Sequence, residues 1–434
     1  MGRFSSVDTR LSAGTGPRLS GNPHARTVRR RDHWRARWHE IGLYAASHPL
    51  ALIGVELLRL AGPALRVPGL GIVVSDPALA RRLLDDDEHF SKSAPGSAGA
   101  VQSQVLGEYA LLNLDGEAHR SLRRRIGDLF GARYLDTITA EVLAEPVASL
   151  VAQLQSDMTV DLVPFVQRLT GRMICHQIGI VPASGDEDRT YQEMFERGAS
   201  LVAMMRLSTI RFNEKQVAAA RELWADFVDR VAVAYRSSGE GSSVVQKLGS
   251  LGLSLPEITG VAGALFLTGT QSVSTALPRL IALLLDTRQW TQLRQRPELL
   301  GQAIDEGLRV TVPSPVMLRS TIADMEIGGV RFRRGDRVVV LTYNLAKDRR
   351  LYPRPRQFDI LRQHPPEGRN LWFGVGGRFC LGYGLAQREL RTVLSALLSL
   401  DDELEVVRRR PARGVLIPAY ERLEIRLQQS KGPA

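Results

Sequence analysis

The sequence predicts a mainly α-helical fold with small β-sheets on one side. A long apolar helical pattern opens with a capping box, Ser254 to Glu257, and continues to about Leu285. A second helical pattern runs from about Leu381 to Leu398. Strand-like runs are few and short: Gly71 to Val74 is one, and Val406 to Leu427 is predicted to form closing strands.

Length leaves the number of domains open. With 434 residues the chain exceeds the usual single-domain size, so two or three domains would be ordinary. No linker visibly divides it, and one large helical domain fits as well. We expect a single domain over residues 31–434. A flexible Arg-rich tail is expected over residues 1–30, where Gly, Ser, Arg and Pro leave few apolar positions.

The chain carries 57 Lys and Arg against 46 Asp and Glu, a net charge of +11. Such a balance suits nucleic acid, an anionic membrane or an acidic protein partner. No helix-turn-helix, zinc-finger or RNA-module signature accompanies it, so we expect no nucleic-acid partner. The basic residues would then either receive an acidic protein or form a solvated surface.

Three features indicate the compartment. The longest apolar run near the N-terminus, Pro49 to Leu58, contains Glu56 and is too short to span a bilayer. No apolar segment follows Arg29 to Arg31, so we do not interpret these arginines as an export signal. Two distant cysteines, Cys175 and Cys380, argue against a disulfide framework and fit a reducing cytoplasm. We therefore expect a cytoplasmic protein without a membrane partner, with Cys175 packed in the core.

Caps and apolar periodicity predict the remaining helices. Ser75 to Pro77 provides a cap and a first-turn proline for a helix to about Asp86. In contrast, His89 to Gly107 is rich in Ser, Gly and Ala without clear periodicity, which predicts a long loop. Further helices are expected from Trp34 onward and over Asp161 to Gly179. Two more are expected within residues 186–235, joined near Leu207 to Asn213, and an exposed flexible connection follows over Ser237 to Ser243.

Cys380 lies in a glycine-rich stretch, Asn370 to Gly382, just before the second helical pattern. Glycines let the backbone take φ > 0 and fold closely around a bulky group. A thiol at a helix N-terminus meets the positive end of the dipole and free amides, which lower its pKa and favour a thiolate. A buried thiolate held by amides is a good axial ligand for haem iron. A lone cysteine in such a loop is more often a packing residue, but the whole string of residues 373–382 favours the ligand.

The string Phe-x-x-Gly-x-Arg-x-Cys-x-Gly, from Phe373 to Gly382, resembles the haem-ligand loop of the cytochrome P450 family. Further family patterns recur in order over roughly residues 65–430. The resemblance implies the cytochrome P450 fold, with haem b between the long central helix and the helix after Cys380. It implies that Cys380 is the iron ligand and that Phe373, Gly374 and Gly382 belong to the cofactor-binding loop.

His119 and Arg123 are four residues apart, on one face of a predicted helix. Solvated arginines on a capped surface helix would explain most such segments. The resemblance instead makes both side chains ligands of a haem propionate, because the run from Asp115 matches the family's Asp-x-x-x-His-x-x-x-Arg segment. Buried carboxylates need this charge compensation. By the same resemblance, Arg319 and Arg378 are further propionate ligands.

Glu306 and Arg309 have the i, i+3 spacing of a helical ion pair. Surface pairs of this kind are common and contribute little to stability. The pair resembles the family's Glu-x-x-Arg motif, which stabilises the fold behind the thiolate loop rather than doing chemistry. We expect Arg354 or Arg356 to complete the network.

Residues 268–273 form a polar patch inside the long apolar helix, with Gly269 in its middle. The glycine could simply ease helix packing, and Pro278 is expected to kink the helix near Ser274. By resemblance, Gly269 lets the haem and bound oxygen come close to the helix. The catalytic candidates are then Thr268, Gly269, Gln271 and Ser272.

The chain departs from the family at this patch. The family usually has an acid followed by threonine after the glycine, whereas this chain has Gln271 and Ser272. Oxygen activation requires two protons. Ser272 keeps a hydroxyl that can hold water, but Gln271 cannot ionise and relays protons less directly. Hydroxylation stays open, and so does chemistry in which the substrate supplies the hydrogens and radical coupling replaces oxygen insertion.

We therefore expect a cytochrome P450 monooxygenase that hydroxylates a small hydrophobic natural product in secondary metabolism. One alternative is oxidative C–C or C–N coupling of an aromatic substrate such as a tryptophan-derived diketopiperazine. Another is a non-catalytic haem-thiolate sensor or binding protein. Electrons would come from NAD(P)H through a ferredoxin-type donor, because the chain shows no flavin or dinucleotide motif. We expect a monomer.

The resemblance also implies a substrate pocket under a mobile lid. The lid would be formed by residues 186–235, where Met204, Met205 and Leu207 could line the channel, although a core role fits them equally. The pocket residues implied by the resemblance, with a possible rim near the C-terminus, are Leu267, Val316, Met317, Leu318, Val415 and Leu416.

Overall fold

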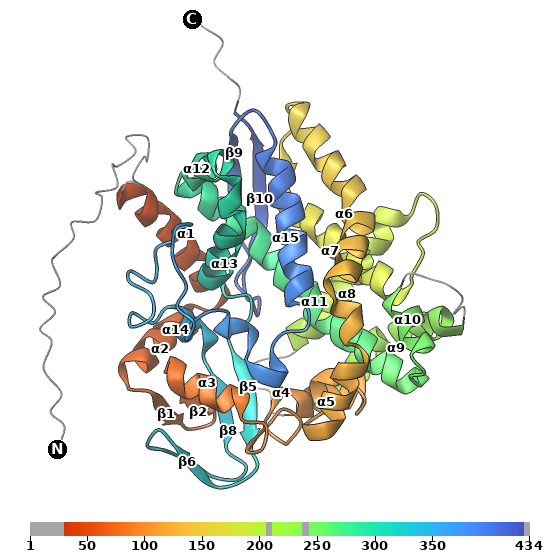
Figure 1. Ribbon diagram of the computed structural model, residues 1–434, viewed down its shortest axis with the longest axis vertical. Coiled ribbons are helices and arrows are strands. Elements are labelled where there is room, and N and C mark those ends of the chain that lie inside the picture. The colour runs from red at the N-terminus through yellow and green to blue at the C-terminus, as the bar shows by residue number, and fades with distance from the viewer. Residues whose placement is uncertain (1–29, 205–210, 237–242, 429–434) are drawn as a thin grey trace, which may run out of the picture.

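A computed structural model describes residues 30–204, 211–236 and 243–428 of the chain (Figure 1). Helices dominate, and the prediction of a mainly helical fold with small sheets is confirmed. The α-helices are α1 Arg30–Ser47, α2 Pro49–Leu60, α3 Pro77–Asp85, α4 Ala98–Leu106, α5 Gly116–Arg125, α6 Ala132–Gln155, α7 Leu162–Ile178, α8 Glu187–Met204, α9 Glu214–Arg236, α10 Val244–Ser250, α11 Leu255–Asp286, α12 Gln289–Gln295, α13 Leu300–Thr311, α14 Thr342–Ala346 and α15 Tyr383–Leu398. Short 3₁₀ helices are η1 Leu111–Asn113, η2 Gly127–Phe130, η3 Pro297–Leu299, η4 Leu371–Phe373 and η5 Gly376–Arg378.

Helix α11 passes through the centre of the molecule (Figure 1). The predicted capping box begins it: the Ser254 backbone N–H donates to Glu257 Oε2 at 2.8 Å. The helix continues through Pro278 as one element. It packs against α7, α8, α9, α13 and α15, which is why most of its side chains are buried.

Three small sheets accompany the helices. The largest has the strand order β1-β2-β8-β5-β3, the second β4-β10-β9, and β6 pairs with β7 as a hairpin. In the first sheet β2 and β8 are parallel, while β5 runs antiparallel to both β8 and β3. The strands are β1 Ala64–Val67, β2 Gly71–Val74, β3 Phe90–Ser91, β4 Val160–Asp161, β5 Met317–Thr321, β6 Met325–Ile327, β7 Val330–Phe332, β8 Arg337–Val340, β9 Leu404–Pro411 and β10 Tyr420–Leu427.

Local signals placed several elements well. Asp76 caps α3 by accepting from the Leu79 amide at 2.8 Å, and Gly179 ends α7 with a left-handed backbone. The loop predicted over residues 89–107 is wrong, because it contains β3 and α4. Ser97 caps α4, and the small residues of this helix form no apolar face, so the sequence showed no helical periodicity here. The predicted tail up to residue 29, most of the joint near Leu207 and the connection up to residue 242 lie outside the described residues.

Within the part of the chain that the structure describes, no helix combines the length and the apolar character needed to cross a membrane.

Glu389 predicts a pH-dependent stability. Burial in α15 raises its pKa from 4.5 to about 8. The folded protein therefore binds more protons than the unfolded chain between these values, so stability falls as pH rises through that window. We expect Glu389→Gln to flatten this dependence and to raise the melting temperature more at about pH 8 than at about pH 5. Thermal unfolding of both proteins at both pH values measures this difference. An equal pH dependence of the melting temperature in the wild type and in Glu389→Gln would contradict the raised pKa of Glu389.

Candidate active site

The glycine-rich loop before α15 folds tightly around Cys380. Gly374 and Gly376 take positive φ values of 84° and 56°. A Cβ on Gly376 would collide with Asp85 Oδ1, so glycine is required for the loop to pack against the end of α3. The Cys380 amide donates to the Phe373 carbonyl at 2.9 Å, which closes the loop. Cys380 itself remains exposed.

The environment of this thiol differs from the sequence prediction. Protein surrounds Cys380 on most sides, and this burial raises the pKa of the thiol, although the side chain keeps accessible surface. The Gly382 amide, Arg123 and Lys92 lower the pKa only in part. The lowering expected from the helix N-terminus is therefore present but outweighed by desolvation. The predicted direction of the pKa shift was wrong.

Four predicted cofactor ligands converge on this loop from three elements. Helix α5 contributes His119 and Arg123, strand β5 contributes Arg319, and the loop itself contributes Arg378. Arg123 Nη2 donates to the Phe379 carbonyl, next to the cysteine, at 2.5 Å. Burial first, and then Arg378 and Arg123, lower the pKa of His119 to about 3. Its Nδ1 is buried without a hydrogen-bond partner among the described residues.

This cluster holds more positive charge than its carboxylates neutralise. Arg378 pairs with Asp115 at 2.6 Å and with Asp87 at 3.2 Å. Arg319 is buried without a carboxylate partner in the described ranges, and its Nη1 donates to the Leu318 carbonyl at 3.0 Å. Burial, and then Arg378, lower the pKa of Arg319 to about 10. A ligand that carries carboxylates would neutralise this excess.

A fifth side chain, Lys92, belongs to this cluster and was missed in the sequence. It follows β3, and the pairing of β3 with β5 brings it toward Arg319. Its backbone N–H donates at 3.0 Å to Asp115, the carboxylate that also holds Arg378. Burial, then Arg319 and Arg378, lower the pKa of Lys92 to about 7. The segment was expected to be a loop, so nothing in the sequence pointed its side chain at the site.

Helix α11 has an exposed turn at its centre. Thr268 and Gly269 are exposed although most of the helix is buried, and no atom lies within 4 Å of the place a Cβ on Gly269 would take. Thr268 Oγ1 donates to the Ala264 carbonyl at 2.7 Å. Ser272 Oγ donates to the Thr268 carbonyl at 3.4 Å, near the limit of a hydrogen bond, so it is the more weakly held hydroxyl. Gln271 is half-buried beside it.

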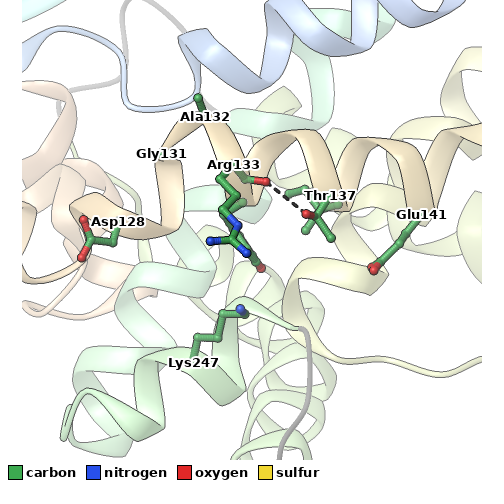
Figure 2. Close-up of a pocket in the computed structure, with 9 residues that line it drawn as sticks. Asp128, Gly131, Ala132, Arg133, Thr137, Glu141 and Lys247 are labelled. Atoms are coloured by element: carbon green, nitrogen blue, oxygen red, sulfur yellow. Dashed lines mark hydrogen bonds between the residues drawn. The ribbon is translucent and has the colours of Figure 1, made fainter.

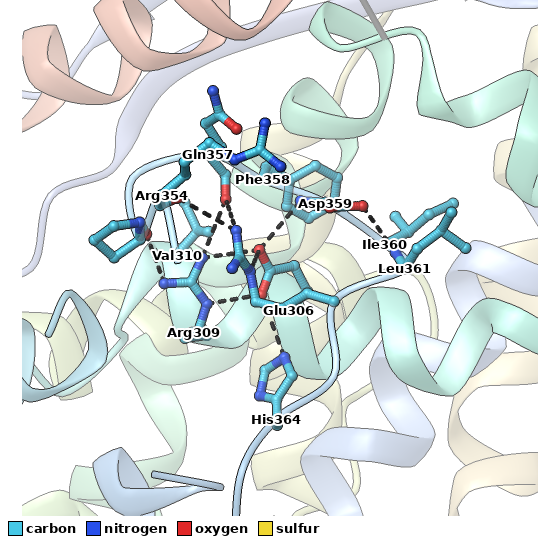
Figure 3. Close-up of polar contacts among 12 residues, drawn as sticks. Glu306, Arg309, Val310, Arg354, Gln357, Phe358, Asp359, Ile360, Leu361 and His364 are labelled. Atoms are coloured by element: carbon cyan, nitrogen blue, oxygen red, sulfur yellow. Dashed lines mark hydrogen bonds and ion pairs between the residues drawn. The ribbon is translucent and has the colours of Figure 1, made fainter. Parts of the chain in front are cut away.

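Behind the loop that holds Cys380, Glu306 and Arg309 of α13 form a fully buried ion pair with contacts of 2.7 and 2.8 Å. Arg362 and His364 approach the same carboxylate at 2.9 and 3.2 Å (Figure 3). Burial alone would raise the pKa of Glu306, but these partners outweigh it and lower the pKa to about 2. The pair is therefore a core interaction, unlike the surface pair that its spacing alone suggested.

The prediction that Arg354 or Arg356 completes this network is wrong. Arg354 offers only its carbonyl, which accepts from Arg362 at 3.3 Å. Arg356 pairs with Glu56 of α2. Several arginines lie close together in this segment, and spacing could not tell which of them folds back onto α13.

The residues predicted to line a substrate pocket fall in different apolar clusters. Leu267 is buried with side chains of α9, α10 and α11, and Leu416 packs against the same cluster. Val316 and Leu318 pack against a small cluster of β2 and β8 side chains, and Met317 against another on the same sheet. Among the remaining candidates, Val415 is half-buried, Met204 packs against the cluster of Leu267, and Met205 and Leu207 lie outside the described residues.

A separate hollow of about 430 Å³ lies between the start of α6 and α10 (Figure 2). Lys247 lies 4.5 Å from the centre of the Tyr134 ring on its wall. No predicted site residue lines it, so we do not assign it to the candidate active site.

The fold resembles that of solved cytochrome P450 enzymes. The epothilone B-bound cytochrome P450epoK structure matches 89% of this chain and 98% of its own, with a TM-score of 0.74 and 21% sequence identity. This likeness is one of fold, and within that fold the cysteine of the glycine-rich loop lies beside the cation cluster.

Sequence comparisons identify the family. A cytochrome P450 family model matches residues 282–400. The putative cytochrome P450 YjiB of Bacillus subtilis is 25% identical over 80% of this chain and 86% of its own. The 20-oxo-5-O-mycaminosyltylactone 23-monooxygenase of Streptomyces fradiae is 31% identical over 67% of this chain and 66% of its own. The chain belongs to the bacterial cytochrome P450 family and is an oxidoreductase.

Replacing Glu306 by Gln should strongly destabilise the fold, because Arg309 and Arg362 would keep buried charges without a counter-ion. Removing one member of a buried pair costs about 3–5 kcal/mol. The matched control is Glu298→Gln, which removes an exposed pair with Arg296 at 3.0 Å and should leave the melting temperature nearly unchanged. Thermal unfolding followed by circular dichroism compares them, and equal stability of the two variants would rule out a stabilising role for Glu306.

Proposed function

We propose that Cys380 would hold the iron of a haem, and that the cluster of His119, Arg123, Arg319, Arg378 and Lys92 would bind its propionates. The observation that carries this proposal is the exposed thiol beside buried cations that two carboxylates cannot neutralise. Two propionates would supply the missing negative charge. Iron coordination would also remove the thiol proton, which burial otherwise retains.

The chemistry we propose is oxidation of a small hydrophobic natural product. A haem with a thiolate ligand supplies reductive activation of O₂ when bound there. The protein contributes the exposed turn of α11 at Thr268 and Gly269, where a ligand can approach the backbone, and the weakly held Ser272 hydroxyl, which can hold a water. The name of the Streptomyces fradiae relative, a monooxygenase, supports hydroxylation as the first candidate.

Oxidative coupling of an aromatic substrate is the second candidate. The observation that favours it is the lack of an ionisable side chain in the middle of α11: the helix has only Glu257, Arg279 and Asp286, which lie away from the exposed turn. Gln271 cannot ionise, so proton delivery at this turn falls to the Ser272 hydroxyl and any water it holds. Coupling, in which the substrate supplies hydrogens, depends less on this delivery.

Electrons would reach the haem from NAD(P)H through a separate ferredoxin-type donor. Support comes from the missing flavin and dinucleotide motifs and from the net charge of +11, which suits an acidic partner. We also infer a cytoplasmic monomer.

Cys380→Ser should lose the reduced, CO-bound absorption band at about 450 nm that thiolate ligation produces. Serine keeps the size of the side chain but is a poor iron ligand. Cys175→Ser is the matched control, since Cys175 is buried in the apolar core and burial raises its pKa to about 12. That variant should keep the band. A Cys380→Ser protein with an unchanged band would refute the ligand assignment.

Turnover under ¹⁸O₂ should distinguish the two candidate reactions, since hydroxylation places the label in the product and pure coupling does not. Gln271→Glu restores an ionisable group on the exposed turn and should raise the share of consumed O₂ that appears in a hydroxylated product. Gln246→Glu, on α10, is the matched control for the added charge. An unlabelled product would exclude hydroxylation, and CO binding without any NADPH-dependent turnover would indicate a sensor.

A further inference from the structure

A second cavity, of about 660 Å³, opens among α6, α13, α15 and the segment of residues 362–369. It lies behind the loop of residues 370–382 that holds Cys380, on the side of the Glu306 network. Tyr383, the first residue of α15, lines it, and the Tyr383 ring packs at 5.1 Å against Phe373 and at 5.3 Å against Phe379. The cavity thus shares a wall with the loop that holds Cys380, yet it contains none of the proposed haem ligands.

The walls carry an excess of positive charge. Four arginines line the cavity, against two carboxylates from Asp136 and Asp305, although one of the four, Arg362, is already paired with Glu306. Asp136 is already held by Arg388 at 2.6 Å, and Asp305 accepts from Gln387 at 2.9 Å. Two of the arginines remain weakly compensated. Arg369, whose side chain is 60% exposed, is 3.7 Å from Asp305, and Arg391, which is also exposed, has no ion pair or hydrogen bond within the described ranges.

Arg391 also lies against the positive end of a helix. Its Nη2 is 3.0 Å from the place a Cβ on Gly301 would take, in the first turn of α13. No side chain caps that turn, because Leu299 occupies the N-cap position, although the Leu300 amide already donates to the Pro297 carbonyl of η3. The dipole of this twelve-residue helix disfavours a guanidinium at its N-terminus, and an anion between the two would relieve that repulsion.

A buried histidine on the wall adds an independent observation. The His364 side chain is only 5% exposed, and its Nε2 lies 3.2 Å from Glu306 Oε2. Its Nδ1 is buried without a hydrogen-bond partner among the described residues. A buried polar nitrogen without a partner is uncommon in folded proteins, and a ligand or water in the cavity that His364 lines could supply one.

We propose that this cavity binds a phosphate group, held by Arg369, Arg391 and the first amides of α13. A dianion with several acceptor oxygens matches two weakly compensated guanidinium groups and a helix N-terminus better than a single carboxylate does. The site is independent of the proposed haem chemistry. The bound phosphate would also lie near Tyr383, whose ring packs against the loop that holds Cys380.

Isothermal titration of the full-length holoprotein with inorganic phosphate, at low ionic strength, tests the site. We expect saturable binding of one phosphate that is about tenfold weaker in Arg391→Gln and in Arg369→Gln, and that weakens as salt is added. Arg331→Gln, on the exposed face of the β6–β7 hairpin at the bottom of Figure 1, is the matched control and should bind like the wild type.

The site is overturned if phosphate shows no saturable binding, or if both cavity variants bind it as tightly as Arg331→Gln. The same titration is repeated with acetate, and an affinity of the protein for acetate equal to its affinity for phosphate would overturn the assignment of the ligand as a dianion. Calorimetry measures phosphate binding by its heat and not by enzyme turnover, so a failure to bind phosphate would leave the haem proposal intact. Loss of the CO band in Cys380→Ser would likewise leave the phosphate site intact.

Discussion

The carboxylate of Glu306 is the constraint on which the rest of the site depends. It is fully buried, and it is stable as an anion only because Arg309, Arg362 and His364 surround it. These partners come from α13 and from a segment more than fifty residues later in the chain. A buried charge cannot be left unpaired without a large free-energy cost, so this segment must return to α13 in one arrangement. The loop that holds Cys380, residues 370–382, follows that segment directly along the chain.

On its other side, the loop faces the opposite electrostatic problem. Lys92, His119, Arg319 and Arg378 are crowded together with few acids, and burial lowers the pKa of the first three. The same desolvation raises the pKa of the Cys380 thiol. A neutral thiol beside crowded cations is a poor ground state for the protein alone. An anionic cofactor would neutralise the crowded cations, and its metal would stabilise the deprotonated sulfur of Cys380. These two effects are the physical reason to propose haem here.

The chemistry that we propose for such a cofactor depends on the exposed turn of α11. Most serine and threonine hydroxyls on this helix donate back to carbonyls four residues earlier, as Thr268, Thr270 and Ser274 do at 2.6 to 2.8 Å. Ser272 makes the longest of these contacts, so its hydroxyl is the most available one. With Gln271 beside it, the turn can hold water but has no side-chain acid of its own. This composition is the observation on which the choice between the two proposed reactions rests.

Local chemistry in the sequence was sufficient for the fold class, the capping box of α11, the cap of α3 and the family motif around Cys380, because each is written in residues close together along the chain. The haem ligands were inferred from that resemblance and stay a proposal. The tertiary structure alone decided that Arg362 rather than Arg354 or Arg356 reaches Glu306, that Lys92 joins the cation cluster, and that burial outweighs the helix N-terminus at Cys380. These outcomes depend on desolvation and on pairing between distant segments, and neither leaves a periodic trace in sequence.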